Sequence, residues 1–260
     1  MLSDEECRRC AEDILRAARH REPIQQPTRT FPAMDILDAY RIQDLCVQAR
    51  IAGGARVVGH KIGLTSRAMQ VALQTNEPDS GRILDDAVYR HGAQIRADSF
   101  LKPLLEVEVA FIMGENLEGP DVRTEDVMRA TQRVVPALEI VDRRTDLPRT
   151  LIDTIADNAA FGAIVIGADS RPPKDVDVGW LGATLARNGV IEESGVSAAV
   201  MGHPAAAVAW LANRLHGAGA GLEKGQLVLS GAFMRPVNVK AGDSILADYG
   251  PLGTLGVSFV

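Results

Sequence analysis

The N-terminal fifty or so residues carry apolar positions at the spacing of an α-helix. Ser3 followed by Glu6 has the form of a capping box, which predicts that a first helix begins there. Asp35 is placed to cap a second helix that runs to Ile51 and ends at Gly53. Prolines between the two helices indicate an extended connector. The apolar positions of the first helix are Cys7, Ala11, Ile14, Leu15 and Ala18.

After residue 56 the pattern changes to short runs that are rich in β-branched and apolar residues. Asn188 and Gly189 form the signal of a type I′ turn between strands at 184–187 and 190–191. The other predicted strands are 57–62, 104–113, 134–141, 161–166, 226–229, 245–248 and 255–260.

Three further helices interrupt these strands, one after Ser66, one after Thr124 and one at 204–215. Because strands and helices do not alternate regularly, a doubly wound parallel sheet fits poorly, and the pattern favours the α+β class. We expect a smaller helical N-terminal region at residues 1–79, followed by a β-rich catalytic domain at residues 80–260.

The composition limits the classes of partner. The 260 residues are 46% hydrophobic and 24% charged, which suits one large domain or one domain with a smaller attachment. A net charge of −6 without a long run of either sign argues against nucleic acid or an anionic membrane as partner, whereas a small anionic substrate is compatible with it. Without a bilayer-length apolar segment or a secretory signal, we expect a cytoplasmic protein.

Cys7 and Cys10 form a C-x-x-C pair. A metal or redox site would need a second pair of ligands or a preceding strand of the thioredoxin type, and the pattern shows neither. We therefore interpret the pair as part of the apolar face of the first helix. Three cysteines also do not make a disulfide framework.

The strand predicted at 104–113 carries two acidic residues on one face. Because side chains alternate along a strand, Glu106 and Glu108 point to one side, and the apolar residues between them point to the other. The two carboxylates lie about 6.6 Å apart along the strand, close enough to converge on one cation. A solvated outer face is the alternative explanation.

A third carboxylate strengthens the metal hypothesis. Glu139 lies in the run 134–141, which is otherwise apolar enough to be buried. A buried carboxylate is costly unless it finds a partner, and a metal shared with Glu106 and Glu108 would provide one. Three carboxylates without His or Cys select a hard cation, Mg²⁺ or Mn²⁺. Octahedral coordination would leave three positions for a bidentate substrate and one water molecule.

Two other segments carry candidate chemistry. Lys61 lies in a predicted strand between Gly59 and Gly63, which permit a close approach of the backbone, although an ordinary edge-strand lysine would fit as well. Asp79 ends the turn-like sequence Glu77-Pro78-Asp79, which would also fit a surface turn.

Read in order, these segments resemble the 2-keto-4-pentenoate hydratase / 4-oxalocrotonate decarboxylase family of the fumarylacetoacetase superfamily. The resemblance covers nearly the whole chain, and no single segment would carry it alone. Besides the two acids at 106 and 108, its segments are GHKIGLTS at 59–66, EPD at 77–79, PALE at 136–139, ADNA at 156–159, GHP at 202–204 and YGPLG at 249–253.

The resemblance implies a mixed β-sandwich roll behind the smaller N-terminal region, assembled as a homo-oligomer and able to associate with a decarboxylase or aldolase of the same pathway. It implies that Glu106, Glu108 and Glu139 are the metal ligands and that Lys61 and Asp79 belong to the active site. Lys61 would bind the anionic end of a small 2-oxo acid, and Asp79 would transfer a proton or activate water. The metal would chelate the C1 carboxylate and the C2 oxygen and stabilise an enolate.

The implied reaction is the addition of water to a 2-hydroxydienoate or 2-oxoalkenoate in the meta-cleavage catabolism of aromatic compounds. Decarboxylation of 4-oxalocrotonate is the alternative, because it uses the same electron sink. Residues 161–167 resemble the hydratases, since the decarboxylases continue with a Ser-Ser-Thr-Arg-Phe type of sequence there. Residues 230–236 are similar to hydratases that act on longer diacids, such as 2-oxohept-4-ene-1,7-dioate.

Three residues are expected to contact the substrate. Arg235 is suited to hold a distal carboxylate bidentately, with Ser230 at the turn before it, although a surface arginine is the alternative. The segment 142–152 is shorter than in the diacid hydratases, so Arg144 is expected at the substrate while the choice between it and Arg143 stays open.

Two rival classes remain. A hydrolase that cleaves a C–C bond of an acylpyruvate would use the same three carboxylates, but the EPD and ADNA segments argue against it. A non-catalytic subunit of a hydratase–decarboxylase complex would be expected to lack Lys61 or a metal ligand, and none of these residues is missing.

Overall fold

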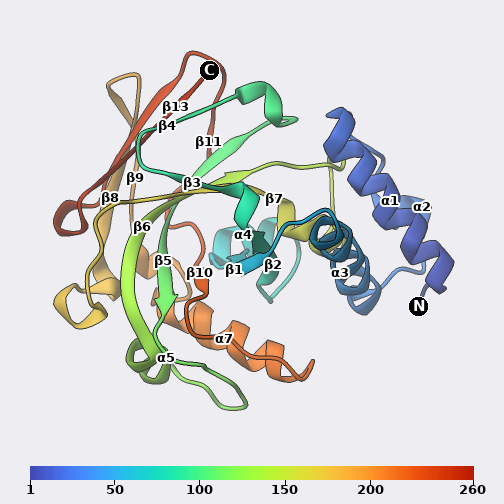
Figure 1. Cartoon of the computed structure of the whole chain (residues 1–260), viewed down its shortest axis with the longest axis horizontal. Helices are drawn as coiled ribbons and strands as arrows, with labels where there is room; N and C mark the ends of the chain where they lie inside the picture. Colours follow the sequence, from blue (N-terminus) through green and yellow to red (C-terminus); the bar gives the residue numbers. More distant parts are fainter.

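The computed structural model describes residues 1–260, in which the N-terminal helices lie at one side and the strands of a small sheet at the other (Figure 1). The N-terminal helices are α1 (Asp4–His20), α2 (Pro27–Thr30) and α3 (Ile36–Ala52). Both predicted caps are confirmed, because Ser3 and Glu6 form a capping box at α1, and Asp35 caps α3. Cys7 and Cys10 are buried, unbridged residues of α1, as the helical interpretation required.

A mixed eight-stranded sheet forms the centre of the molecule. Its strands follow the order β2-β1-β10-β5-β6-β7-β3, and β11 pairs with β5 beyond the short β10. The pairs β1–β10 and β3–β7 are parallel, and the others are antiparallel. The bounds are β1 (Val57–Gly63), β2 (Asp79–Leu84), β3 (Val88–Arg90), β5 (Leu104–Met113), β6 (Thr131–Val141), β7 (Phe161–Ile166), β10 (Leu227–Leu229) and β11 (Val237–Asn238).

A second, five-stranded sheet follows the order β4-β13-β12-β8-β9. The β8–β9 hairpin turns at Asn188 and Gly189, whose φ values of 54° and 82° confirm the predicted turn. The bounds are β4 (Ala93–Ile95), β8 (Gly182–Arg187), β9 (Val190–Val196), β12 (Ser244–Asp248) and β13 (Thr254–Phe259).

The remaining helices are short except for the last. They are α4 (Arg67–Ala72), α5 (Thr124–Ala130), α6 (Leu151–Ala156) and α7 (Pro204–His216). Single 3₁₀ turns occur at Asp85–Ala87, Ala97–Ser99, Asn158–Ala160, Pro173–Asp175, Val178–Trp180, Ser197–Ala199 and Gly250–Leu252. No helix is both long enough and apolar enough to cross a membrane.

The two faces of the central sheet have different environments. One face shares a large apolar core with the small sheet and α7, and Val107 of β5 and Leu138 of β6 point into it. Because side chains alternate, the acidic residues beside them point to the other face. That face carries a smaller apolar cluster, which includes Ala110 and Ala137. The alternation along β5 and β6 therefore places three carboxylates on the side away from the main core.

The N-terminal helices cover this second side. Helices α1 and α3 form a separate apolar cluster with Ile155 and Ala156 of α6. Gln43 of α3 is buried and donates hydrogen bonds of 2.9 Å to the carbonyl oxygens of Ser80 and Ile155, which ties α3 to both β2 and α6. Strands β1 and β2 belong to the central sheet, so the boundary expected after residue 79 passes through that sheet.

Candidate active site

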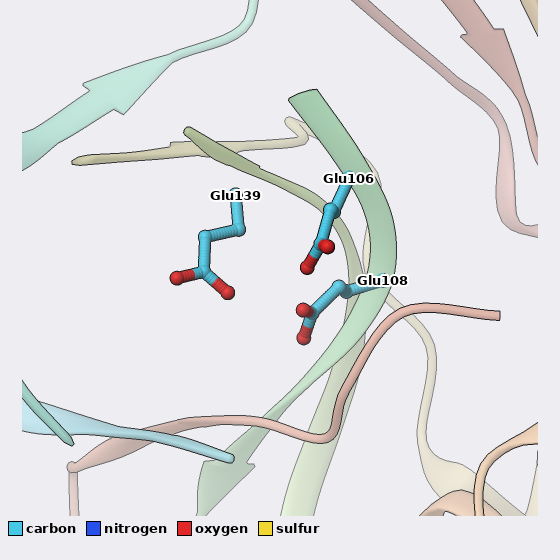
Figure 2. A group of neighbouring side chains, drawn as sticks. All are labelled: Glu106, Glu108 and Glu139. Atoms are coloured by element: carbon cyan, nitrogen blue, oxygen red, sulfur yellow. The ribbon is translucent and has the colours of Figure 1, made fainter. Parts of the chain in front are cut away.

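Three glutamates meet on neighbouring strands of the central sheet. Glu106 and Glu108 lie on β5, and Glu139 on β6 is the residue directly opposite Glu106 in the antiparallel register. One oxygen of each carboxylate lies within 4.8 Å of the others. Figure 2 shows the three side chains pointing toward one another. The structure thus brings together the three acids that the sequence identified as candidate metal ligands.

Two of these carboxylates are fully buried, Glu106 is half-buried, and few hydrogen-bond donors face them. Glu108 and Glu139 are fully buried, and Oε1 of Glu108 and both oxygens of Glu139 accept no hydrogen bond. Burial, reinforced by the charge of Glu139, raises the pKa of Glu106 to about 7, and burial with the same neighbour raises the pKa of Glu108 well above its ordinary value. Buried carboxylate oxygens that accept no hydrogen bond are costly, and oxygen donors are what a hard divalent cation prefers. The cluster therefore fits a divalent cation.

Lys61 of β1 lies beside this cluster. Its Nζ is 3.2 Å from Oε1 of Glu139 and donates a 2.9 Å hydrogen bond to the carbonyl oxygen of Ala159. Burial alone would lower the pKa of Lys61, but the facing carboxylates, Glu139 foremost, raise it above its ordinary value. The side chain is 4% exposed, so it places a nearly fully buried ammonium next to the acids.

Asp79, the first residue of β2, is paired with Gly63 of β1. Its side chain is buried, neither oxygen has a hydrogen-bond partner, and burial raises its pKa. A Cβ atom at Gly63 would overlap Oδ1 of Asp79 and come within 3.1 Å of Nζ of Lys61. Only glycine leaves room there, so the backbone of β1 is shaped around these two side chains.

A pocket of about 90 Å³ opens at this point and is lined by Lys61, Asp79, Glu106 and also by Arg149. Arg149 was missed in the sequence analysis. Its Nη1 is buried without a hydrogen-bond partner. In the sequence it looks like any charged residue before a helix cap, and only its place in the segment 142–152 hinted at a role.

The structure corrects the placement of Arg144. This arginine is buried but does not line the pocket. Its Nε binds Oδ1 of Asp157 at 2.5 Å, its Nη2 donates to the carbonyl oxygen of Asp157 at 3.0 Å, and its Nη1 donates to that of Phe161 at 2.9 Å. Arg144 therefore holds both ends of the segment between Asp157 and Phe161, away from the pocket beside the glutamates.

The segment held in this way is a left-handed turn. Asn158, Ala159 and Ala160 have φ values of 50°, 53° and 57°, a conformation that costs an alanine about 1–2 kcal/mol. Asn158 fixes the turn to β2, because its Oδ1 accepts from the backbone N–H of Arg82 at 2.8 Å and its Nδ2 donates to the carbonyl oxygen of Arg82 at 2.9 Å. The turn directs the carbonyl group of Ala159 toward Lys61.

Two more expected substrate contacts are also placed elsewhere. Ser230 is fully buried and its hydroxyl donates to the carbonyl oxygen of Val109, while the next residue, Gly231, donates its N–H to Oε2 of Glu108 at 2.8 Å. The side chain of Arg235 is 83% exposed and pairs with Glu193 at 2.8 Å. Ser230 therefore supports the turn that orients Glu108. Arg235 is an exposed residue whose guanidinium pairs with Glu193 of β9.

Comparison with known proteins gives close matches over the full length. A relative from Escherichia coli, 2-oxo-hept-4-ene-1,7-dioate hydratase, is 44% identical over 96% of this chain and 96% of its own. The 2-hydroxyhexa-2,4-dienoate hydratase of Comamonas testosteroni is 39% identical over 95% of this chain and 94% of its own. No family model matches the chain.

Among solved structures, 4-oxalocrotonate decarboxylase from Pseudomonas putida G7, complexed with magnesium and adipate, matches with a TM-score of 0.98 and 31% identity. The match covers 100% of this chain and 99% of the decarboxylase. The expected α+β fold is thereby confirmed, and a divalent-metal site is supported by the magnesium of that structure together with the carboxylate cluster of this one. Given these full-length matches, the chain belongs to the 2-keto-4-pentenoate hydratase / 4-oxalocrotonate decarboxylase family.

Proposed function

We propose that this protein is a metal-dependent hydro-lyase that adds water to a 2-hydroxydienoate or 2-oxoalkenoate of meta-cleavage aromatic catabolism, with a seven-carbon diacid as the preferred substrate. The observation that carries the proposal is the cluster of Glu106, Glu108 and Glu139 beside Lys61, in a chain that is 44% identical to a diacid hydratase. We assign the three glutamates as metal ligands and Lys61 and Asp79 as catalytic residues.

The proposed cation is Mg²⁺, with Mn²⁺ as a functional substitute, because the donor set is made of carboxylate oxygens alone. A bound divalent cation would act as a Lewis acid that polarises the 2-oxo group and stabilises the negative charge that develops there. Gly231 orients one of the proposed ligands: its N–H donates to Oε2 of Glu108 and leaves Oε1 free for the cation.

Lys61 contributes a positive charge at the same end of the pocket. Its ammonium is anchored between Ala159 and Glu139 and has few competing water molecules, because the side chain is nearly fully buried. Electrostatic interactions are stronger in such a dry site than in water. Lys61 can therefore bind the C1 carboxylate and stabilise charge on the adjacent oxygen without having to move.

Asp79 is the group best suited to carry the proton. Hydration of a 2-hydroxydienoate delivers one proton to the far carbon while the 2-hydroxyl group releases its own proton to form the 2-oxo group. Water then adds, with its oxygen at C4 and a proton taken up at C3. Burial raises the pKa of Asp79, which favours its protonated form, and both of its oxygens are free to face the pocket. Asp79 can give the first proton and regain one from the attacking water, so that the proton released by the 2-hydroxyl group balances the one taken up at C3.

Decarboxylation of 4-oxalocrotonate is the second candidate reaction, because the matched decarboxylase has almost the same backbone. Hydration is favoured by the higher identity to hydratases, 44% against 31% for that decarboxylase. The test is an ultraviolet assay of the purified protein with Mg²⁺ on 2-hydroxydienoates and on 2-oxohex-3-enedioate. We expect hydration of the dienoates. Release of CO₂ from 2-oxohex-3-enedioate with no hydration of any dienoate would establish the decarboxylase instead.

A homo-oligomeric state and association with a decarboxylase or aldolase of the same pathway are proposed on the family resemblance alone. Sedimentation equilibrium of the purified protein checks the first, and a monomer at micromolar concentration would contradict it.

A further inference from the structure

The pocket beside the carboxylate cluster is lined by one residue of β6, Val141. Glu139 and Val141 of β6 are two residues apart, so their side chains share a face and lie roughly 7 Å apart along the strand. Val141 lines the pocket together with Arg149, which precedes α6, and Thr154, which lies in α6. The pocket thus has an acidic end at Glu106 and a second end at α6.

Most polar groups of this lining are already engaged. Nζ of Lys61 binds Ala159 and Glu139, the hydroxyl of Thr154 donates to the carbonyl oxygen of Thr150 at 3.0 Å, and the hydroxyl of Ser66 caps α4. Arg149 differs from them, because its buried Nη1 has no hydrogen-bond partner, although the charges of Asp157 and Asp79 act on the guanidinium. An arginine stays protonated at neutral pH, so Nη1 of Arg149 is a charged donor without an acceptor in the chain.

The charged groups around the pocket indicate which kind of acceptor Arg149 would bind. Four carboxyl groups and two cationic side chains surround the pocket, and a divalent cation is assigned to the three glutamates. With the cation and Lys61 engaged at the C1 end of a 2-oxo acid, Arg149 is left as the positive group at the other end. Guanidinium groups bind carboxylates with particular geometric specificity. The six charged residues are Lys61, Asp79, Glu106, Glu108, Glu139 and Arg149.

We propose that Arg149 binds the distal carboxylate of a dicarboxylic substrate and is the residue that makes this enzyme select diacids over monoacids. The inference rests on the proposed function, in that it assumes a 2-oxo acid bound with its C1 end at the carboxylate cluster. It also reassigns to Arg149 the role that the sequence analysis gave to Arg235, whose guanidinium lies on the surface against Glu193.

The test measures binding without turnover. Two saturated analogues of equal length, 2-oxoheptanedioate and 2-oxoheptanoate, lack the double bond that is hydrated and differ only in the distal carboxylate. Their dissociation constants are measured by titration calorimetry in the presence of Mn²⁺ for the parent protein, Arg149→Ala and Arg149→Gln. Arg235→Ala is the matched control, because it removes the same side chain from the surface.

We expect the parent protein to prefer the dicarboxylate, and each Arg149 variant to reduce that preference by about 10- to 100-fold. Arg235→Ala should keep the preference of the parent protein. The glutamine variant retains a polar side chain of moderate size, so it serves where the alanine variant fails to fold.

Two results would overturn the assignment. An unchanged preference in the Arg149 variants would show that Arg149 does not contact the distal carboxylate. Equal weakening of both analogues would show that Arg149 acts at the shared end, for example by orienting Asp79 across the pocket. Failure of the proposed function is distinguishable from both, because it would appear as a parent protein that hydrates no dienoate, whatever its binding preference.

Discussion

Replacing Asn158 by alanine should separate the stability of the left-handed turn from its effect on Lys61. The substitution removes two hydrogen bonds to the backbone of Arg82, at 2.8 and 2.9 Å. Each is worth about 0.5–1.5 kcal/mol. It also places alanine at a φ of 50°, which asparagine tolerates better, at a cost of roughly 1 kcal/mol. The expected loss in free energy of unfolding is therefore about 2–4 kcal/mol.

The hairpin turn between β8 and β9 offers a matched control. Asn188 has a φ of 54°, and its side chain also makes two hydrogen bonds, to Oδ1 of Asp243 at 3.0 Å and from the backbone N–H of Ser244 at 2.9 Å. Asn188→Ala should therefore cost a similar free energy of unfolding, measured by urea titration. It lies in the β8–β9 hairpin turn of the second sheet, whereas Lys61 belongs to the central sheet.

Only Asn158→Ala should also impair the reaction. Relaxation of its turn withdraws the carbonyl group that anchors Nζ of Lys61, and loss of one charged hydrogen bond corresponds to about a tenfold or larger fall in kcat/KM. Both variants are assayed at a temperature at which each is folded. Equal kcat/KM values for Asn158→Ala and Asn188→Ala would refute the claim that the turn positions Lys61.

Two further predictions follow from the geometry of the site. Burial raises the pKa of Glu106 from 4.5 to about 7, so the folded, metal-free protein holds a proton that the unfolded chain releases. Its stability should therefore fall as pH rises from about 4.5 to about 7, and a flat profile in chelator would contradict this. Gly63→Ala should lower kcat/KM by about tenfold or more, because the new Cβ overlaps Asp79 and approaches Lys61, whereas Gly182→Ala, where a Cβ meets nothing within 4 Å, should retain the activity of the parent protein.

Much of the fold could be predicted from the apolar runs of the strands and from the alternation of side chains along them. Strands β5 and β7 occupy the residues expected for them, because their apolar runs are long and bounded by polar segments. The alternation along β5 also separated its acids from its apolar residues, which is why the glutamate cluster could be anticipated. In contrast, β2 and α6 were not predicted, since DSGRIL and LIDTIA are six-residue segments without a clear period.

The arginines show what sequence patterns could not provide. Arg144, Arg149 and Arg235 all lie in irregular segments, where no periodicity sets the direction of a side chain. Two of the side chains are directed by carboxylates that lie elsewhere in the sequence, since Asp157 holds Arg144 and Glu193 holds Arg235. Nη1 of Arg149 has no hydrogen-bond partner in the chain. Substrate contacts were therefore the least predictable part of the site.

The most direct test of the account is whether the three glutamates bind one divalent cation. After treatment with a chelator, the parent protein should bind one Mn²⁺ per chain in titration calorimetry. Glu139→Gln should weaken that binding by about tenfold or more, because it removes one of the anionic donors that a hard cation requires. Glu115→Gln, an exposed glutamate outside the cluster, should bind Mn²⁺ as the parent protein does. A parent protein that binds no Mn²⁺, or a Glu139→Gln variant with unchanged affinity, would contradict the central claim.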